Sequence, residues 1–157
     1  MSFLAARRRP VTALAVVAVT ASGLVSAGAV AAAPAWAAAC TSTKKGVTEV
    51  VDFTKLGGKV ETACDAANPA TGLAALTGAG FTYAFVPRYP GLVCTIDKEP
   101  KPCNGAPAKA YWSYWQAKRG GTWVYSKLGA GTYKPVPGSV EGWAFGAGQA
   151  PSVAPPS

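Results

Sequence analysis

Large aromatic side chains are concentrated in one short stretch of the second half of the chain. Seven of them fall there: Tyr111, Trp112, Tyr114, Trp115, Trp123, Tyr125 and Tyr133. Side chains along a strand alternate between two faces, and a small sheet commonly buries only one of them. The pattern therefore predicts either a second layer that covers these rings or a surface on which some of them contact a ligand.

The N-terminal residues have the pattern of a secretion signal. Arginines at 7–9 precede an apolar run at 11–33, and the run ends in Ala35-Trp36-Ala37, the spacing of a signal-peptidase site. We expect residues 1–39 to be a signal peptide that is removed on export. Two alternatives remain: the run is long enough to serve as a retained membrane anchor, and Cys40 is in position to carry a lipid.

The charge of the exported part is moderately basic. The full chain has 15 basic and 7 acidic residues, and loss of the three signal arginines leaves a formal charge of +5. The lysines are scattered, whereas nucleic-acid binding needs a basic face. We therefore expect a secreted domain with no nucleic-acid partner and, after signal removal, no membrane span.

The composition divides the exported part into a domain and a tail. Residues 40–146 have the length of one domain with a modest core. Residues 147–157 are dominated by Ala, Pro and Ser and offer few side chains for a core. We expect them to form a disordered tail.

Four cysteines lie in the exported part, and their even number predicts two disulfides in an oxidising compartment. Four cysteines allow three pairings. We favour Cys94–Cys103, which closes a short loop rich in Pro and Lys, and Cys40–Cys64, which fixes the N-terminus of the domain.

Alternating apolar residues and turn residues predict an α+β fold, with one short helix packed on a mixed or antiparallel sheet. Thr71 is the expected N-cap of the helix, and Gly80 is its expected end. The expected strands lie at 46–53, 59–63, 81–86, 92–96, 111–118, 122–126 and 140–145.

The strands at 111–118 and 122–126 should form a hairpin around Gly120-Gly121. A loop of two or four residues would pair Gln116 with Tyr125 and give two distinct faces. The expected ligand-binding face carries Trp112, Tyr114, Gln116, Lys118, Trp123 and Tyr125. The expected core face carries Tyr111, Ser113, Trp115, Ala117, Val124 and Ser126. A loop of three residues would reverse the parity, and coverage of both faces would make the aromatics packing alone.

The sequence offers no catalytic constellation. It contains no histidine, which removes His-dependent nucleophile systems and histidine metal sites. Asp97 and Glu99 lie too close together in one loop to make a convincing glycosidase pair, and Glu141 is expected to be a surface residue. We therefore expect no enzyme activity, no metal and no cofactor.

Several segments, in order, resemble the transcobalamin-like C-terminal domain, a family similar to the β-domain of cobalamin carriers. They are 72–76, 91–97, 111–115 and 141–143. The resemblance implies a β-grasp-like fold and a bound soluble ligand, with a corrinoid as the suggestive case. Lys98 departs from the family, where a glycine usually follows the aspartate, and a single domain supplies only half of a carrier's pocket.

Together these observations predict a secreted, non-catalytic domain that captures a small flat or amphipathic ligand, such as a corrinoid, on its aromatic face. The alternative is an extracellular interaction domain that docks a cell-surface protein or a cell-wall polymer, because exposed aromatics rimmed by lysines suit protein contacts equally well.

Overall fold

The computed structural model describes residues 38–157. The predicted signal segment lies, except for its last two residues, outside the described residues, as do the signal-peptidase site and the alternative membrane anchor. Within residues 38–157, no helix has both the length and the apolar character needed to span a bilayer.

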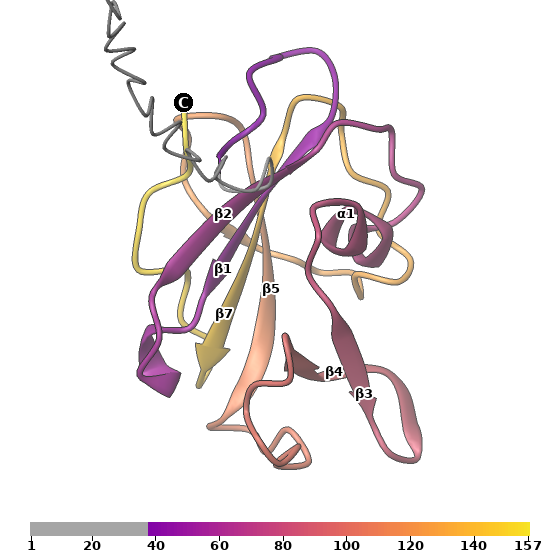
Figure 1. Ribbon diagram of the computed structural model, residues 1–157, viewed down its shortest axis with the longest axis vertical. Coiled ribbons are helices and arrows are strands. Elements are labelled where there is room, and N and C mark those ends of the chain that lie inside the picture. The colour runs from indigo at the N-terminus through magenta and orange to yellow at the C-terminus, as the bar shows by residue number, and fades with distance from the viewer. Residues whose placement is uncertain (1–37) are drawn as a thin grey trace, which may run out of the picture. The chain divides into compact units, whose positions relative to one another are not determined.

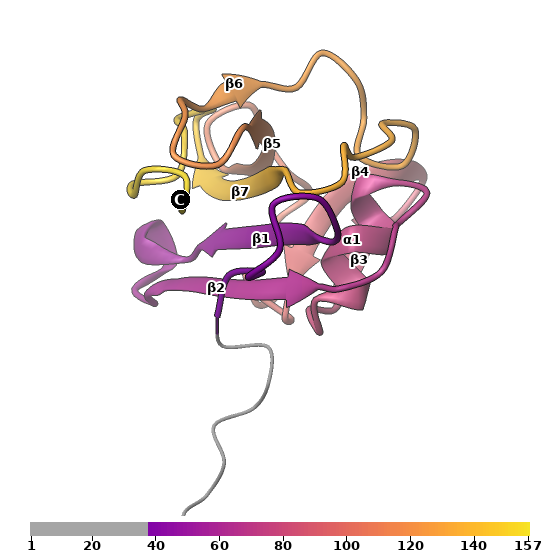
Figure 2. The same ribbon diagram turned by 90° about the horizontal axis from the view of Figure 1, so that it is seen from above.

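Five strands form a mixed sheet in the order β2-β1-β7-β5-β6 (Figure 1). Figure 2 shows this order from β2 at one edge to β6 at the other. The two central strands, β1 and β7, are parallel, and the other neighbours are antiparallel. The strands are β1 (Val47–Asp52), β2 (Val60–Asp65), β5 (Tyr111–Ala117), β6 (Val124–Tyr125) and β7 (Val140–Gly146).

The remaining elements are short. A 3-10 turn (Thr54–Leu56) follows β1, and α1 (Gly72–Gly78) follows β2. A separate antiparallel pair, β3 (Tyr83–Val86) and β4 (Tyr89–Ile96), comes next. In Figure 1, α1 and this pair lie on one side of the large sheet, and the C-terminal segment lies on the other. The predicted α+β arrangement, with one helix on a mixed sheet, is confirmed.

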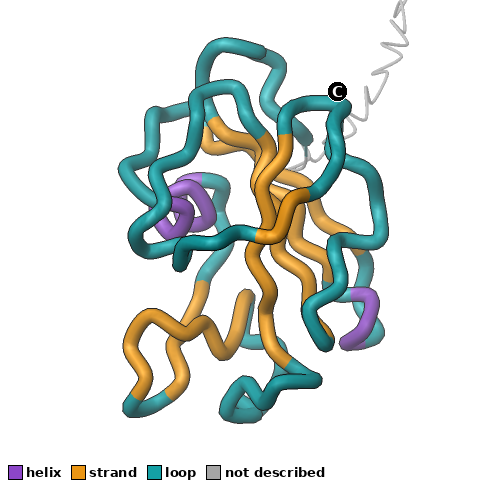
Figure 3. Tube along the Cα trace, turned by 180° about the vertical axis from the view of Figure 1, so that it is seen from behind, coloured by secondary structure: helices purple, strands orange, loops and turns teal. Residues whose placement is uncertain are grey.

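Helix α1 is fixed at its first turn by side-chain and backbone hydrogen bonds. The Thr71 hydroxyl accepts a bond of 3.1 Å from the Ala74 amide, so Thr71 is the N-cap as predicted. The Gly72 amide donates to the carbonyl of Tyr133, in the loop between β6 and β7. Figure 3 shows loop segments, in teal, beside the helix, in purple. A helix of seven residues is marginal alone, so packing on the sheet stabilises it.

The main core lies between α1 and the sheet and is rich in aromatic rings. Leu76 and Trp143 are fully enclosed. Trp112 meets the ring of Phe53 edge-on at 5.2 Å, and Tyr114 lies 4.8 Å from the ring of Trp143. Each such buried ring contributes about 1.5–3 kcal/mol of hydrophobic stabilisation. Much of the aromatic cluster therefore serves packing.

Both predicted disulfides are present. Cys40 joins Cys64 and holds the start of the domain to β2, and Cys94 joins Cys103 and closes the loop after β4. Disulfides stabilise chiefly by restricting the unfolded chain. Their presence is compatible with an extracellular location.

The C-terminal segment is not the disordered tail that its composition predicts. The Ser152 amide donates to the Asp52 carboxylate at 2.6 Å, and the Trp123 indole N–H donates to the Val153 carbonyl at 2.7 Å. Gly142 has no side chain, so Trp123 and Pro151 can pack directly over β7. A proline-rich segment keeps its carbonyl acceptors, and here they accept hydrogen bonds from Trp123 and Gly120, in the connection between β5 and β6.

Candidate functional site

The predicted ligand-binding face does not form because the β5–β6 register differs from the expected one. Trp115 pairs with Tyr125, and Gln116 pairs with Val124. A shift of one residue moves every side chain of a strand to the opposite face. The connection between Gln116 and Val124 has an odd number of residues, whereas a loop centred on the two glycines would have an even number. The odd number reverses which residues of β6 share a face with those of β5.

The six predicted residues accordingly separate into four places. Trp112 and Tyr114 are core residues, 4% and 7% exposed. Trp123 packs on the other side of the sheet beneath the C-terminal segment, whereas Tyr125 is 45% exposed and contacts Trp115 edge-on.

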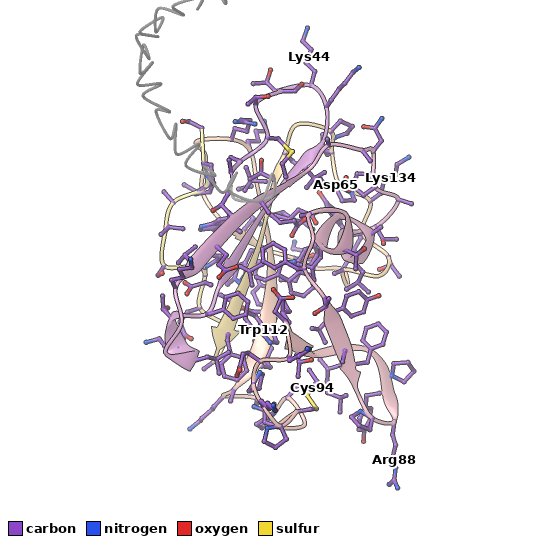
Figure 4. All side chains as sticks on the ribbon, viewed as in Figure 1. Lys44, Asp65, Arg88, Cys94, Trp112 and Lys134 are labelled. Carbon is purple, nitrogen blue, oxygen red and sulfur yellow. A yellow bond between two sulfur atoms is a disulfide. The ribbon has the colours of Figure 1, made fainter. Side chains whose placement is uncertain are left out.

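Gln116 and Lys118 lie instead on the wall of a large cavity, which has a volume of about 590 Å³. The cavity is bounded by the end of β5, by β6 and by the segment that leads into β7. Two of its wall residues, Thr43 and Tyr133, are followed in the sequence by Lys44 and Lys134. Figure 4 shows these two lysines at the end of the molecule opposite Cys94. The wall consists of Thr43, Gln116, Ala117, Lys118, Arg119, Val124, Tyr133, Val136, Pro137, Gly138 and Ser139.

The cavity wall is largely apolar, with a few polar groups at defined positions. The Gln116 side-chain amide donates to the Ser126 hydroxyl at 2.8 Å, which fixes its orientation. Lys118 and Arg119 supply positive charge, and of the residues described, no carboxylate lines this cavity. Concave, mainly apolar sites with few polar groups are typical of small-molecule binding sites.

A smaller hollow of about 260 Å³ lies on the other side of β6. Three of the four predicted aromatic residues, Trp112, Tyr114 and Tyr125, line it together with the exposed side chains of Leu92 and Leu128. These three rings and the pair Gln116 and Lys118 therefore line two different hollows, and Trp123 lines neither.

A pair of buried carboxyl groups, which the sequence reasoning missed, lies beneath α1. Glu49 of β1 and Glu141 of β7 are direct partners in the parallel register, and both are fully buried. The Trp143 indole N–H donates to Glu49 Oε2 at 3.1 Å. Both the Tyr114 hydroxyl and Glu141 Oε2 approach the bare Cα of Gly72, where a methyl group would clash with them.

Burial shifts the protonation of this pair. Burial, followed by repulsion from Glu141, raises the pKa of Glu49 well above its usual value. Burial also raises the pKa of Glu141, to about 7, although hydrogen bonds from Tyr114 and Glu49 oppose the rise. Burial raises the pKa of the Tyr114 hydroxyl as well, with Glu141 as the next cause. Glu141 is thus no surface residue, contrary to prediction.

A signal for this pair was present in the alternation of the strands. Glu49 stands at the same parity as Val47 and Val51, and Glu141 at the parity of Trp143. A carboxyl within the apolar parity of a strand indicates a buried acid. That the two acids lie side by side became evident only from the pairing of β1 with β7 in the structure.

Comparison with known families identifies one similar domain. Residues 104–156, which contain β5, β6, β7 and the C-terminal segment, match the family model of the SCO2322-like domain. The matched part contains every wall residue of the large cavity except Thr43. No curated protein and no solved structure matches the chain.

This match overturns the resemblance to the transcobalamin-like C-terminal domain, which was wrong. The segments 111–115 and 141–143, which carried the resemblance, have a simpler physical explanation. Trp112, Tyr114 and Trp143 are core rings of two paired strands, a pattern that any packed aromatic sheet can produce. The suggestion of a corrinoid rested on that resemblance and loses its basis.

Proposed function

We propose that this domain binds a small amphipathic molecule, without catalysis, in the cavity between β5, β6 and the segment before β7. The observation that carries the proposal is the cavity itself. Its volume of about 590 Å³ falls within the range of about 300–1,000 Å³ that is usual for small-molecule sites. Val124 and Val136 supply an apolar wall, and Gln116 and Tyr133 supply polar groups that orient a ligand.

Binding without chemistry suits the composition of the wall. Among its described residues the wall carries neither a carboxylate nor a thiol, and the chain has no histidine. General acid–base or nucleophilic catalysis commonly depends on one of these groups. The buried pair Glu49 and Glu141 does not supply it, because neither residue lines the cavity.

The strand order supports a β-grasp-like assignment as part of the proposal. A hairpin, β1–β2, is followed by a helix and then by strands that return to place β7 parallel to β1 at the centre. In this arrangement the cavity lies at the end of β5, where β6 leaves an open edge. The disulfides and the N-terminal sequence pattern favour action outside the cell.

The first experiment uses a neutral flat probe, N-phenyl-1-naphthylamine, whose fluorescence rises in apolar sites. We expect saturable binding by the native domain and about ten-fold weaker binding by Val136→Trp, because the larger ring fills the cavity mouth. Val136 is 61% exposed, so the substitution leaves the core intact. Val153→Trp, at a partly exposed position off the cavity wall, is the matched control.

Unsaturable fluorescence, or equal binding by Val136→Trp and Val153→Trp, contradicts the proposal. Circular dichroism melts of both variants exclude misfolding as the reason for lost binding.

A second candidate function is docking of an extracellular protein or cell-wall polymer. The specific observation in its favour is a pair of exposed apolar side chains at and after β6 that line the smaller hollow. Tyr125 is 45% exposed and Leu128 56%. Exposed apolar patches commonly mark contact surfaces. Nothing in these side chains favours one macromolecular partner over another, so the large cavity carries the leading proposal.

A further inference from the structure

The large cavity has an uncompensated positive charge. Lys118 and Arg119 both lie on its wall, and among the wall residues within 38–157 there is no Asp or Glu to balance them. The exported part of the chain is itself basic, with a formal charge of +5. A concave site with one sign of charge concentrates ligands of the opposite sign.

Arg119 is held in place by main-chain oxygen atoms. Its guanidinium donates to the carbonyls of Cys40 and Ser42 and, at 2.8 Å, to the main-chain oxygen of Ser157. These bonds fix the position of the side chain. The Arg119 Nε–H is buried and finds no acceptor among the residues of the described chain. A buried charged donor without a partner is costly, so a ligand whose binding shifts the wall enough to bring an acceptor to it gains affinity.

A second unsatisfied group lies on the same wall. The Ser139 hydroxyl is buried and, within the part of the chain described, forms no hydrogen bond. Lys118 is exposed, so its ammonium is available to an incoming anion. The rest of the wall, including Val124, Val136 and Pro137, is apolar. The wall therefore combines an exposed ammonium, two buried donors without partners among the described residues, and an apolar surface.

We propose that the ligand is an amphipathic carboxylate, with its head group bound by Lys118, Arg119 and Ser139 and its apolar body packed against Val124 and Val136. The inference rests on the proposed function of the cavity. A carboxylate has two oxygens that accept from several donors at once, which matches the unused groups on the wall. A cationic head group would meet like charge at the same place.

The test compares three ligands with the same eight-carbon chain, namely octanoate, octan-1-ol and octylammonium, by NMR titration at low salt. We expect octanoate to bind most tightly, about five- to ten-fold better than octan-1-ol, and octylammonium to bind most weakly. Lys118→Gln should weaken octanoate about three- to five-fold and leave octan-1-ol unchanged. Ser139→Ala should act in the same direction.

Lys127→Gln is the matched control, since Lys127 is an exposed lysine on the smaller hollow. Equal affinities for octanoate and octan-1-ol, or equal effects of Lys118→Gln and Lys127→Gln, overturn the carboxylate inference and leave the proposed cavity function standing. If neither these ligands nor N-phenyl-1-naphthylamine binds, both proposals fail. Arg119→Lys keeps the charge and removes Nε, so weaker octanoate binding by a variant with native stability would support the role of that donor.

Discussion

At the scale of single residues, the distinctive feature is two acids enclosed in an aromatic core. Glu49 and Glu141 lie opposite each other on the central strands, and both are fully buried. An ionised carboxylate loses hydration there, and a second one beside it adds repulsion. Trp143 offsets part of this cost, because its indole N–H donates to Glu49 Oε2 at 3.1 Å. The pair therefore favours protonated carboxyls.

This protonation predicts that the domain loses stability as pH rises. The pKa of Glu141 is about 7 in the folded state against 4.5 for the unperturbed group. Between these values the unfolded state releases a proton that the folded state keeps, so the free energy of unfolding falls from about pH 4.5 to 7. Glu141→Gln removes the part of this dependence that comes from Glu141, while the part from Glu49 remains. The variant should be more stable than the native domain at pH 8, by up to about 3 kcal/mol.

Urea denaturation at pH 5 and pH 8 measures the effect, with Glu61→Gln on the half-buried edge of β2 as the control for loss of one charge. A Glu141→Gln variant whose stability changes with pH in parallel with the native domain would show that Glu141 does not titrate as described.

At the scale of elements, the C-terminal segment behaves as a layer over the outer face of the sheet. It packs there because Gly142 leaves room for the Trp123 ring and for Pro151. Bonds from Gly120 to Pro156 and from Arg119 to Ser157 extend the contact to the turn before β6. The segment thus also supports Arg119, a wall residue of the large cavity.

A methyl group at Gly142 tests this packing. Its Cβ would lie 2.7 Å from the Trp123 ring and 2.9 Å from Pro151, closer than atoms can approach. We expect Gly142→Ala to destabilise the domain by about 1–3 kcal/mol and to increase the exposure of Trp123, seen as a red shift in fluorescence. Gly129→Ala, where a Cβ meets nothing within 4 Å, is the control and should stay within about 1 kcal/mol of the native domain. Equal stabilities of the two variants would rule out the close packing described.

At the scale of the whole molecule, the local features were predictable and the long-range ones were not. Thr71 as a cap and the pairing of Cys94 with Cys103 follow from short sequence patterns, and both are present. The predicted binding face depended on whether the β5–β6 connection has an even or an odd number of residues. Gln116 pairs with Val124 instead of Tyr125, and this shift of one residue separates the side chains of the predicted face. The pairing of Glu49 with Glu141 joins strands far apart in the chain, which no local pattern specifies.

The long-range arrangement also explains why the large cavity was missed. Its wall draws on Thr43, on the end of β5 and on the segment from Tyr133 to Ser139, which only the folded chain brings together. Gln116 and Lys118 were predicted as ligand-binding residues because they were expected to share a face with aromatic rings, and not because a cavity was foreseen. Their position on the cavity wall supports their candidacy, whereas Trp112 and Tyr114 are core residues.

The most direct measurement is an NMR titration of the isotope-labelled domain with N-phenyl-1-naphthylamine, which reports where a ligand binds. The account predicts that amide signals of Gln116, Val124, Tyr133 and Ser139 shift in a saturable manner. Signals of Leu92, Tyr111 and Leu128, around the smaller hollow, should remain in place. Shifts confined to the smaller hollow, or no saturable shifts at any residue, would contradict the claim that the large cavity is the binding site.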